Sequence, residues 1–323
     1  MLVGWLDGRV SADLTLAEGE TPLGLGTEIQ TDGVFNDSVL VWSPGRPGVV
    51  SAVGGDGTSR KVLEVDDAIH FATADATLSR IFYITVGTGS EPSGLWVASA
   101  GGEGDPVRVN HEFPNRTVSN SFRFRLVASP DGSTLAIQGD EDAVTVIDVE
   151  SGRSGQVAPG GRMIGFADGR LIAFGEGSDI NFGPIIAFDL ETLNGEVLID
   201  WASQARVVTG TDGDLIAVER IDPDNVRAYE ILAVSPRTGE TWVAYTSDPN
   251  EIGPHLRNRD EAPIAAEEPR DWVLLVDNFS RFVVGPERPP LTEPESSYPI
   301  LLNLRTGETI RIGPFQDWSQ PGT

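Results

Sequence analysis

The 323-residue sequence contains no cysteine, only three histidines and a single lysine, Lys61. Without cysteine the chain can form no disulfide, no cysteine-ligated zinc site and no cysteine nucleophile. Acidic residues outnumber basic ones by 49 to 23, which gives a formal net charge of −26. This charge argues against nonspecific binding to nucleic acid and against adsorption to an anionic membrane, since both depend on positive charge.

Long apolar runs are also absent. Segments such as Val39–Trp42 and Val273–Val276 are followed by polar residues or proline-containing turns, whereas a membrane helix needs about 18 apolar residues or more. The apolar start Met1–Leu6 meets Asp7 at once and has no basic region before it, so the sequence predicts no signal peptide. We therefore expect a soluble chain with no membrane insertion. Its location stays open, and an extracytoplasmic location is possible if the gene starts upstream of Met1.

Glycine and proline are abundant, with 37 and 22 copies, and glycine marks a repeat. Short alternating apolar runs are each followed by a glycine turn. The equivalent glycines are spaced by 47, 50, 43, 44 and 68 residues; they are Gly55, Gly102, Gly152, Gly195, Gly239 and Gly307. We assign the longer last spacing to an insertion at residues 247–270, which is proline-rich, charged and without a strand pattern.

A second marker, an Asp-Gly turn between two apolar runs, recurs at residues 129–132, 167–169 and 211–213. Aspartate bonds to the backbone ahead of it and glycine tolerates positive φ, so these turns predict hairpins. Each is followed by a second strand, a third strand, the glycine turn and a short fourth strand. Four antiparallel strands in about 45 residues are typical of a β-propeller blade.

The repeats predict an all-β fold, a single propeller domain over residues 1–323. Residues 2–16 are predicted to form a further hairpin, and residues 315–318 could add one strand. The two ends of the chain, residues 1–16 and 314–323, could thus close a seventh blade together. Seven blades are favoured, and six blades with a long first blade are the alternative. The six repeats lie at residues 25–65, 67–109, 122–157, 163–200, 206–246 and 271–313.

Residues 124–136 read Phe-Arg-Leu-Val-Ala-Ser-Pro-Asp-Gly-Ser-Thr-Leu-Ala and are followed by Val146-Ile147-Asp148 and Ser151-Gly152. This stretch resembles a blade of bacterial propellers of the TolB-like, YVTN-repeat (lactonase-like) and WD-repeat-like superfamilies. The resemblance is good over 122–157, moderate over 163–200 and 206–246, and weak over 67–109 and 271–313. It implies a propeller fold but leaves the activity open, because those superfamilies share the motif across unrelated functions.

Motifs for common chemistries are missing. The sequence has no Gly-x-Ser-x-Gly elbow, no phosphate-binding loop and no two histidines at metal-ligand spacing. His70 reads as a core or channel-lining residue. We predict no catalytic residue and no obligatory cofactor, and favour a non-catalytic, monomeric scaffold that binds a protein, peptide or carbohydrate through loops on one face. The alternatives are a metal-dependent hydrolase or lyase, as the lactonase-like resemblance implies, and the soluble sensor part of a larger envelope protein.

Two acidic loop segments are candidates for a metal site. Both fall between the second and third strands of their blades, and neither follows the spacing of an EF-hand loop. Their oxygens could hold Ca²⁺, which takes 6–8 oxygen ligands; the other interpretation is acidic turns that face water. The residues are Asp140, Glu141, Asp142, Asp222 and Asp224.

Two short basic segments stand out against the acidic background. One lies within residues 106–125 and the other within the predicted insertion. On so acidic a chain they could mark where an anionic ligand or acidic partner docks, or they could neutralise carboxylates of the chain itself. The candidate residues are His111, Arg116, Arg123, Arg125, His255, Arg257 and Arg259.

Overall fold

The computed structural model describes residues 3–5, 30–35, 38–42, 47–54, 58–85, 93–113, 125–138, 143–176, 183–222, 225–248, 255–256, 264–266, 270–276 and 300–311. Within these residues the only helices or strands are β-strands, and none of the described segments is a helix that could cross a membrane. The chain divides into two compact units, Met1–Asp200 with Arg259–Glu267 and Trp201–Asn258 with Glu268–Thr323.

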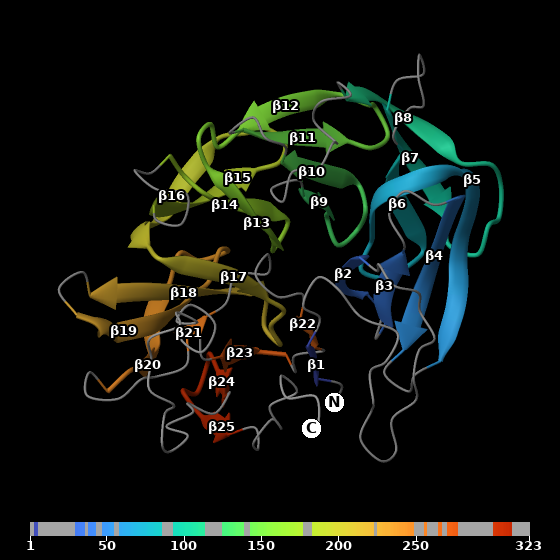
Figure 1. Cartoon of the computed structure of the whole chain (residues 1–323). Coiled ribbons are helices and arrows are strands. Elements are labelled where there is room, and N and C mark those ends of the chain that lie inside the picture. Colours follow the sequence, from blue (N-terminus) through green and yellow to red (C-terminus); the bar gives the residue numbers. More distant parts are fainter. Residues whose placement is uncertain are drawn as a thin grey trace, which may run out of the picture. The chain divides into compact units, whose positions relative to one another are not determined.

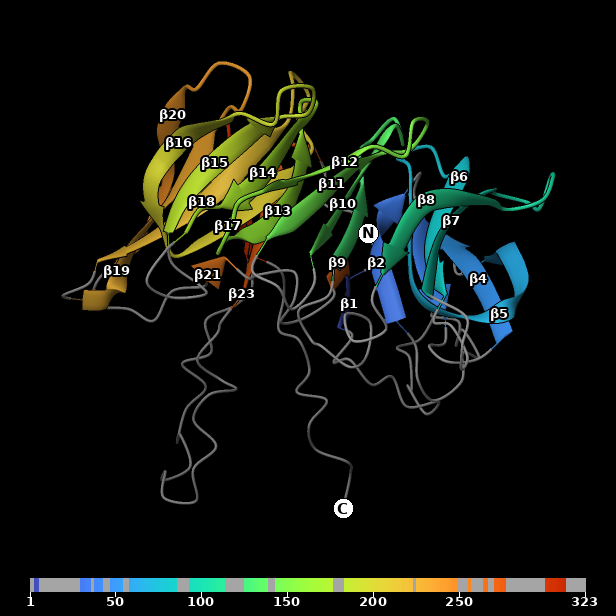
Figure 2. The same cartoon turned by 90° about the horizontal axis from the view of Figure 1, so that it is seen from above.

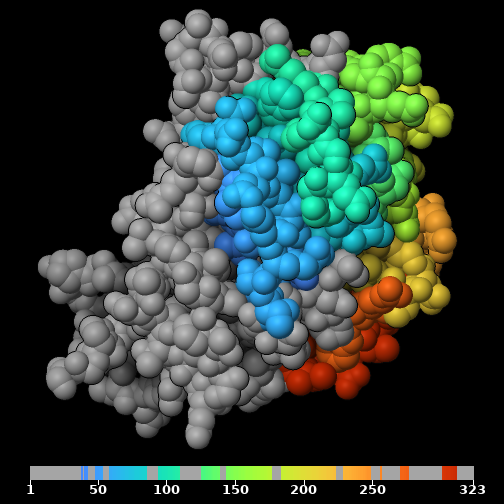
Figure 3. Space-filling model, turned by 90° about the vertical axis from the view of Figure 1, so that its right-hand side faces the viewer, coloured from blue at the N-terminus to red at the C-terminus, as the bar shows by residue number. Residues whose placement is uncertain are grey.

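The first unit contains four antiparallel meanders, numbered here as blades 1 to 4 (Figure 1). Blades 1 and 2 share the long strand β5 and so form one seven-stranded sheet. Their strands are β2 (Gln30–Phe35), β3 (Ser38–Trp42), β4 (Pro47–Gly54), β5 (Ser59–Ala74), β6 (Arg80–Thr85), β7 (Ser93–Ser99) and β8 (Val107–Phe113). Figure 3 shows β4 and β5 in blue beside β7 and β8 in teal on one surface.

Blades 3 and 4 are separate four-stranded sheets whose neighbouring strands follow the chain order (Figure 2). Blade 3 consists of β9 (Arg125–Ala128), β10 (Thr134–Gln138), β11 (Val144–Asp148) and β12 (Ser154–Val157). Blade 4 consists of β13 (Arg162–Ala167), β14 (Arg170–Phe174), β15 (Gly183–Asp189) and β16 (Gly195–Ala202).

The second unit contains blades 5 and 6. Blade 5 consists of β17 (Gln204–Val208), β18 (Leu215–Asp222), β19 (Asn225–Val234) and β20 (Thr241–Thr246). Blade 6 consists of β21 (His255–Leu256), β23 (Trp272–Val276), β24 (Ile300–Asn303) and β25 (Thr309–Arg311).

The apolar core lies between consecutive blades. One buried cluster joins Phe82 of blade 2 to Leu135 of blade 3, and a second joins Val146 of blade 3 to Leu171 of blade 4. In the second unit, a cluster that includes Leu215 and Leu302 joins blades 5 and 6. Sheets that bury their faces against the next sheet along the chain are the blades of a β-propeller, so the predicted fold is confirmed.

The described residues form six blade-like meanders, which match the six repeats and the six-bladed alternative. Of the predicted hairpin at residues 2–16, only β1 (Val3–Trp5) is described; it pairs antiparallel with β22 (Ile264–Ala266). Residues 314–323 lie outside the described part, so the closure of a seventh blade by both termini stays a prediction.

The predicted insertion at residues 247–270, which has no strand pattern in the sequence, contains two short strands. They are β21, which pairs with β23, and β22, which pairs with β1. The long last repeat also has residues 277–299 between β23 and β24, so the assignment of its extra length to residues 247–270 stays a prediction. Proline and charge concealed a two-residue strand because alternation cannot be recognised over two positions.

The recurring glycine turn joins the third and fourth strands of a blade, and its geometry explains the repeat. In blade 3, the Asp148 carboxylate accepts from the Ser151 N–H at 2.7 Å, and the Gly152 N–H donates to the Asp148 carbonyl at 2.9 Å. Ser235 with Gly239 and Asn303 with Gly307 repeat this pattern in blades 5 and 6. The turn therefore requires a short polar acceptor followed four residues later by a residue with positive φ.

Blade 4 satisfies the same turn without glycine. The sequence pattern pointed to Gly195, but Leu193 occupies the equivalent position with φ of 57° and donates its N–H to the Asp189 carbonyl at 2.9 Å. Leu193 packs into the apolar cluster between blades 3 and 4, directly over Gly155. The apolar contact of this partly buried side chain offsets part of the cost of its left-handed backbone.

Substituting Gly239 tests the turn. A methyl group at Gly239, where φ is 72°, would meet no atom within 4 Å, so Gly239→Ala should cost only the backbone penalty. We expect the free energy of unfolding to fall by about 1 kcal/mol, measured by urea denaturation. The exposed Glu240→Ala in the same turn is the control, and equal effects of the two substitutions would contradict this account.

Acid should weaken these turns. Hydrogen bonds from Ser151 lower the pKa of Asp148, and hydrogen bonds from Thr192 lower the pKa of Asp189. Their stabilisation is therefore present above the unfolded aspartate pKa of about 3.9 and is lost as pH falls through the lower folded values.

The double variant Asp148→Asn/Asp189→Asn should retain the turns, because Asn303 already accepts the same N–H bond in blade 6. We expect its stability between pH 6 and pH 2.5, followed by urea denaturation, to fall less steeply than that of the unmodified chain. Identical slopes would show that the two carboxylates do not contribute to acid sensitivity.

Candidate functional site

The structure describes only some of the predicted site residues. Four of the candidate ligand-binding residues and four of the candidate metal ligands lie outside the described part, so their roles stay predictions. These eight are Arg116, Arg123, Arg257, Arg259, Asp140, Glu141, Asp142 and Asp224.

Of the remaining candidates, His111 lies in β8 rather than in the predicted loop, and Asp222 is exposed at the end of β18. Across the described ranges, no three or more of histidine, aspartate and glutamate are grouped so that they could hold a metal ion. The Ca²⁺ site proposed from the sequence stays a prediction. Arg125 and His255 each lie at a junction between two blades, and these two junctions form the candidate site.

At the junction of blades 3 and 4, side chains of one blade bind the backbone of the next. Arg125 Nη1 donates to the Met163 carbonyl at 2.5 Å. Gln138 lies opposite Arg125 in the sheet; its Oε1 accepts from the Met163 N–H and its Nε2 donates to the Gly161 carbonyl, both at 2.8 Å. The oxygen and the nitrogen of the Gln138 amide both form hydrogen bonds with blade 4, so an uncharged side chain is enough to join the two blades here.

Glu219 occupies the corresponding position in blade 5. Gln138 lies six residues after Gly132 of its hairpin, and Glu219 lies six residues after Gly213. Glu219 Oε2 accepts from the Leu256 N–H of blade 6 at 2.7 Å, as Gln138 accepts from Met163. The hydrogen bond to the backbone of the next blade is therefore the same as in blade 3. The side chain that accepts it is a carboxyl group, and Glu219 is only 1% exposed.

The side chain of His255 lies against the carboxyl group of Glu219. Its Nδ1 lies 3.3 Å from Glu219 Oε2, and its side chain is 6% exposed. Its ring lies 4.4 Å from the ring of Tyr229, centroid to centroid. On the other side, Ser203 Oγ lies 3.3 Å from Glu219 Oε1 and 2.9 Å from the Glu219 carbonyl. His255 thus faces an internal carboxyl group, and its role as a ligand-binding residue stays a prediction.

This arrangement places an imidazole nitrogen and a carboxylate oxygen in contact within a buried site. Because both side chains are buried, the described geometry does not present them to a substrate. Sequence reasoning grouped His255 with Arg257 and Arg259 and did not single out Glu219. Aligning the second strands on their hairpin glycines would have shown a glutamate where blade 3 has a glutamine.

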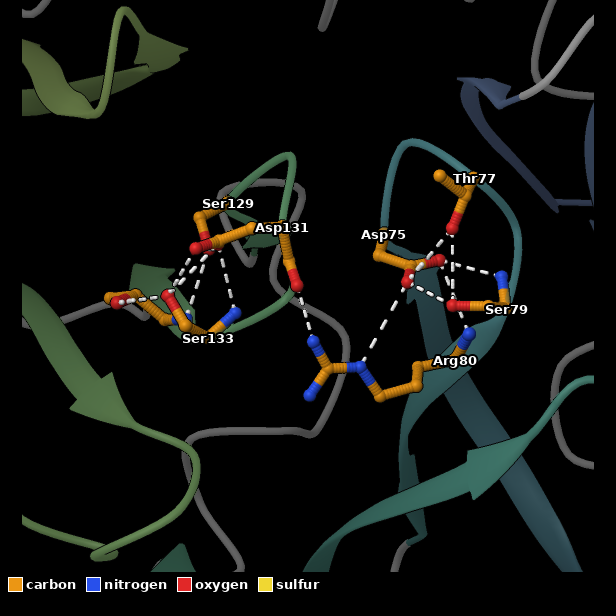
Figure 4. A network of polar contacts seen from close by, with 8 residues as sticks. Asp75, Thr77, Ser79, Arg80, Ser129, Asp131 and Ser133 are labelled. Atoms are coloured by element: carbon orange, nitrogen blue, oxygen red, sulfur yellow. Dashed lines mark hydrogen bonds and ion pairs between the residues drawn. The ribbon is translucent and has the colours of Figure 1, made fainter.

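A second polar network connects blades 2 and 3 (Figure 4). Asp75, buried in the β5–β6 turn, accepts from the Ser79 N–H at 2.7 Å, from the Arg80 N–H at 3.2 Å, and from the hydroxyls of Thr77 and Ser79. Arg80 reaches across and donates to the Asp131 carbonyl in the β9–β10 turn. The Asp75 carboxylate thus accepts hydrogen bonds mainly from its own turn, and its role is to hold that turn in place.

The β9–β10 turn is held in the same way. Asp131 accepts from Ser129 Oγ at 2.6 Å and from the Ser133 N–H at 3.0 Å, and the bond from Ser129 is the main cause of its lowered pKa. The Ala76 N–H donates to the Pro130 carbonyl at 2.9 Å, so the two turns are joined through backbone as well as through Arg80.

In the second unit, Asp271 binds an arginine that reaches a turn of the neighbouring blade, as Asp75 does in the first unit. It accepts from Thr211 Oγ1 and from Arg305 Nε, both at 2.6 Å, and Arg305 also donates to the Gly213 carbonyl at 3.1 Å. Burial raises the pKa of Asp271, but the hydrogen bonds from Thr211 and Arg305 outweigh burial and leave it below the ordinary value.

No protein-family model matches the sequence, and no curated protein matches it significantly. Solved structures do match the fold. An oligogalacturonate lyase in complex with manganese, which is a propeller, has a TM-score of 0.54 at 11% identity, covering 87% of this chain and 75% of that one. TolB from Acinetobacter baumannii has a TM-score of 0.44 at 13% identity, covering 86% of this chain and 66% of that one. At such identity, the lyase match supports the propeller fold and nothing finer.

A substitution series at Asp75 tests the network between blades 2 and 3. Asp75→Ala removes the acceptor of two part-buried N–H groups and should lower the free energy of unfolding by about 1–3 kcal/mol. Asp75→Asn can keep the acceptor for both N–H groups and should cost less. The exposed Glu103→Ala, at a position outside this network, is the control, expected within about 0.5 kcal/mol of the unmodified chain. Chemical denaturation measures all three, and equal losses for Asp75→Asn and Asp75→Ala would contradict the backbone-acceptor role.

Proposed function

We propose that the chain is a non-catalytic propeller that binds a protein, peptide or carbohydrate partner on its surface, and that an extended protein or peptide segment is the best fit among these. The observation that carries the proposal is a set of exposed aliphatic side chains on the fourth strands of the blades. The solvent-exposed fractions are 63, 53, 52 and 46% for Val107, Val197, Val243 and Ile310 respectively.

The four strands that carry these side chains each lie at the end of a sheet. β16, β20 and β25 are the last strands of blades 4, 5 and 6, and β8 ends the seven-stranded sheet. An edge strand offers unpaired backbone N–H and C=O groups to an extended segment, while exposed apolar side chains add contact area. An exposed valine beside such an edge favours a peptide partner over a carbohydrate, because sugars are recognised mainly by polar groups and aromatic faces.

The polar residues of the described blades support a scaffold role. Asp75, Asp131 and Asp271 are each occupied by hydrogen bonds from their own or a neighbouring turn. Side chains engaged in this way hold the blades together and are not available as general acids or bases. Two features therefore support the proposal: turns held by hydrogen bonds within the blades, and exposed aliphatic side chains on strands at the ends of the sheets.

Substitutions on β20 test the proposal. Peptides selected on the purified chain from a displayed random library serve as probes. Val243→Lys should weaken their binding about tenfold or more, because a charge replaces an apolar contact. Thr241→Lys, exposed two residues away on the same strand, is the matched control and should leave affinity nearly unchanged. Isothermal titration measures both variants.

Two results would overturn the proposal. Selected peptides that bind Val243→Lys as tightly as the unmodified chain, with the same outcome for lysine at Val107, Val197 and Ile310, would remove the edge strands as the binding surface. Release of unsaturated products from oligogalacturonate in the presence of Mn²⁺, the substrate and metal of the lyase with a similar fold, would show that the chain is catalytic.

A further inference from the structure

We propose that Asn194 is a site of spontaneous chemical modification, at which the asparagine is converted through a cyclic imide and water to aspartate and isoaspartate. Asn194 and Gly195 form the only Asn-Gly pair in the sequence. Asn194 ends the turn between β15 and β16, Gly195 begins β16, and both residues are exposed. The inference does not depend on what the surface binds.

The reaction begins when the backbone nitrogen of Gly195 attacks the side-chain carbonyl carbon, Cγ, of Asn194. A bond forms between these two atoms, the bond from Cγ to Nδ2 breaks, and the Gly195 N–H proton leaves with the amide nitrogen as ammonia. Water then opens the imide ring. Cleavage of the ring bond at Cγ gives aspartate, whereas cleavage at the backbone carbonyl carbon gives isoaspartate, in which the main chain runs through the former side chain.

The turn directs the attacking nitrogen to solvent. The Asp189 N–H donates to the Asn194 carbonyl at 3.0 Å, and the Leu193 N–H donates to the Asp189 carbonyl at 2.9 Å. Because hydrogen-bonded and non-hydrogen-bonded pairs alternate along antiparallel strands, the next N–H of the strand, that of Gly195, points away from β15. β16 is the last strand of its sheet, so this N–H lies at the sheet edge, where hydroxide can remove its proton.

The side chains at this position leave the attack unhindered. Gly195 has no Cβ to obstruct its own nitrogen, and a Cβ there would lie 2.8 Å from Ile186 Cγ2 and from Phe188 Cε1, so packing against β15 requires glycine. Among the described residues, no hydrogen bond holds the Asn194 side-chain amide; its backbone N–H donates to Thr192 Oγ1 at 3.4 Å. The amide is therefore able to turn toward the Gly195 nitrogen.

Asn303 of blade 6 provides an internal reference, because its surroundings oppose the same reaction. Its Oδ1 accepts from the Arg305 N–H at 2.9 Å and from the Thr306 N–H at 3.0 Å. The N–H that would attack belongs to Leu304, which is buried and donates to the Asp271 carbonyl at 2.7 Å. The nucleophile and the amide are thus both held by hydrogen bonds at Asn303.

Isoaspartate should open the turn. Its formation removes the Asn194 carbonyl carbon from the main chain, where its oxygen accepts from the Asp189 N–H, and inserts a methylene group between Leu193 and Gly195. The hydrogen bond that starts the pairing of β15 with β16 is then lost. Aspartate keeps the ordinary main chain and should keep this bond.

Ageing the full chain under native conditions at mildly alkaline pH tests the site. Digestion after glutamate releases residues 192–196, which contain Asn194, and residues 296–308, which contain Asn303. We expect the first peptide to give two additional forms, separated by chromatography and each heavier by the difference between a hydroxyl and an amino group. The second peptide should stay unchanged. Mass spectrometry that finds no conversion at Asn194, or equal conversion at Asn303, would overturn the proposal.

Freshly prepared Asn194→Asp separates the change in main chain from the change in charge, because it adds the carboxylate without the methylene group. Hydrogen exchange of the Asp189 amide should be about two- to tenfold faster in the isoaspartyl form than in the unmodified chain, the range expected for loss of one intramolecular hydrogen bond. In Asn194→Asp it should change by less than about twofold. Equal exchange in the two forms would contradict the opening of the turn by isoaspartate.

Discussion

Burial of both faces of a four-stranded sheet is the constraint on which the rest of this structure depends. A single blade has apolar side chains on each face, and a meander of four short strands cannot cover either face by itself. Apolar clusters shared by blades 2 and 3, by blades 3 and 4, and by blades 5 and 6 meet this need. The spacing of the repeat follows, since each blade must present the same apolar positions to its neighbours.

Apolar contact between sheets does not fix how one sheet sits along the next, because the hydrophobic effect is not directional. Polar side chains that cross the junctions add direction. Gln138 and Arg125 bind the backbone of β13, Arg80 binds the turn of blade 3, and Arg305 binds the turn of blade 5. These contacts also explain part of the acidic composition, since carboxylates such as Asp75 and Asp271 position the arginines that reach across.

The repeat made the fold predictable from the sequence. Asp-Gly and glycine turns occur at the ends of strands for conformational reasons that act locally, so strand order and blade boundaries could be inferred from single positions such as Gly132 and Gly239. Prediction was wrong where a non-local interaction outweighed local preference. Leu193 adopts a glycine-like φ with its side chain partly buried beside Gly155. β21 has only two residues, which pair with β23, and Glu219, 36 residues before its first residue, accepts a hydrogen bond from it.

The candidate site was less accessible to sequence reasoning for the same reason. A glutamate inside a β-strand of an acidic chain does not stand out, and the basic residues beside His255 suggested a surface. Only the contact between Glu219 and His255 shows that one blade junction has a carboxyl group against an imidazole where another has a neutral amide. Glutamine and glutamate have nearly the same shape, so replacing one by the other preserves the backbone bond and the packing around it. The exchange places a carboxyl group at a buried position, where an ionised carboxylate is costly unless it is paired and hydrogen-bonded. The chemistry of a junction can therefore differ from one pair of blades to the next without any change in the fold, because the backbone bond that joins the two blades is the same in both.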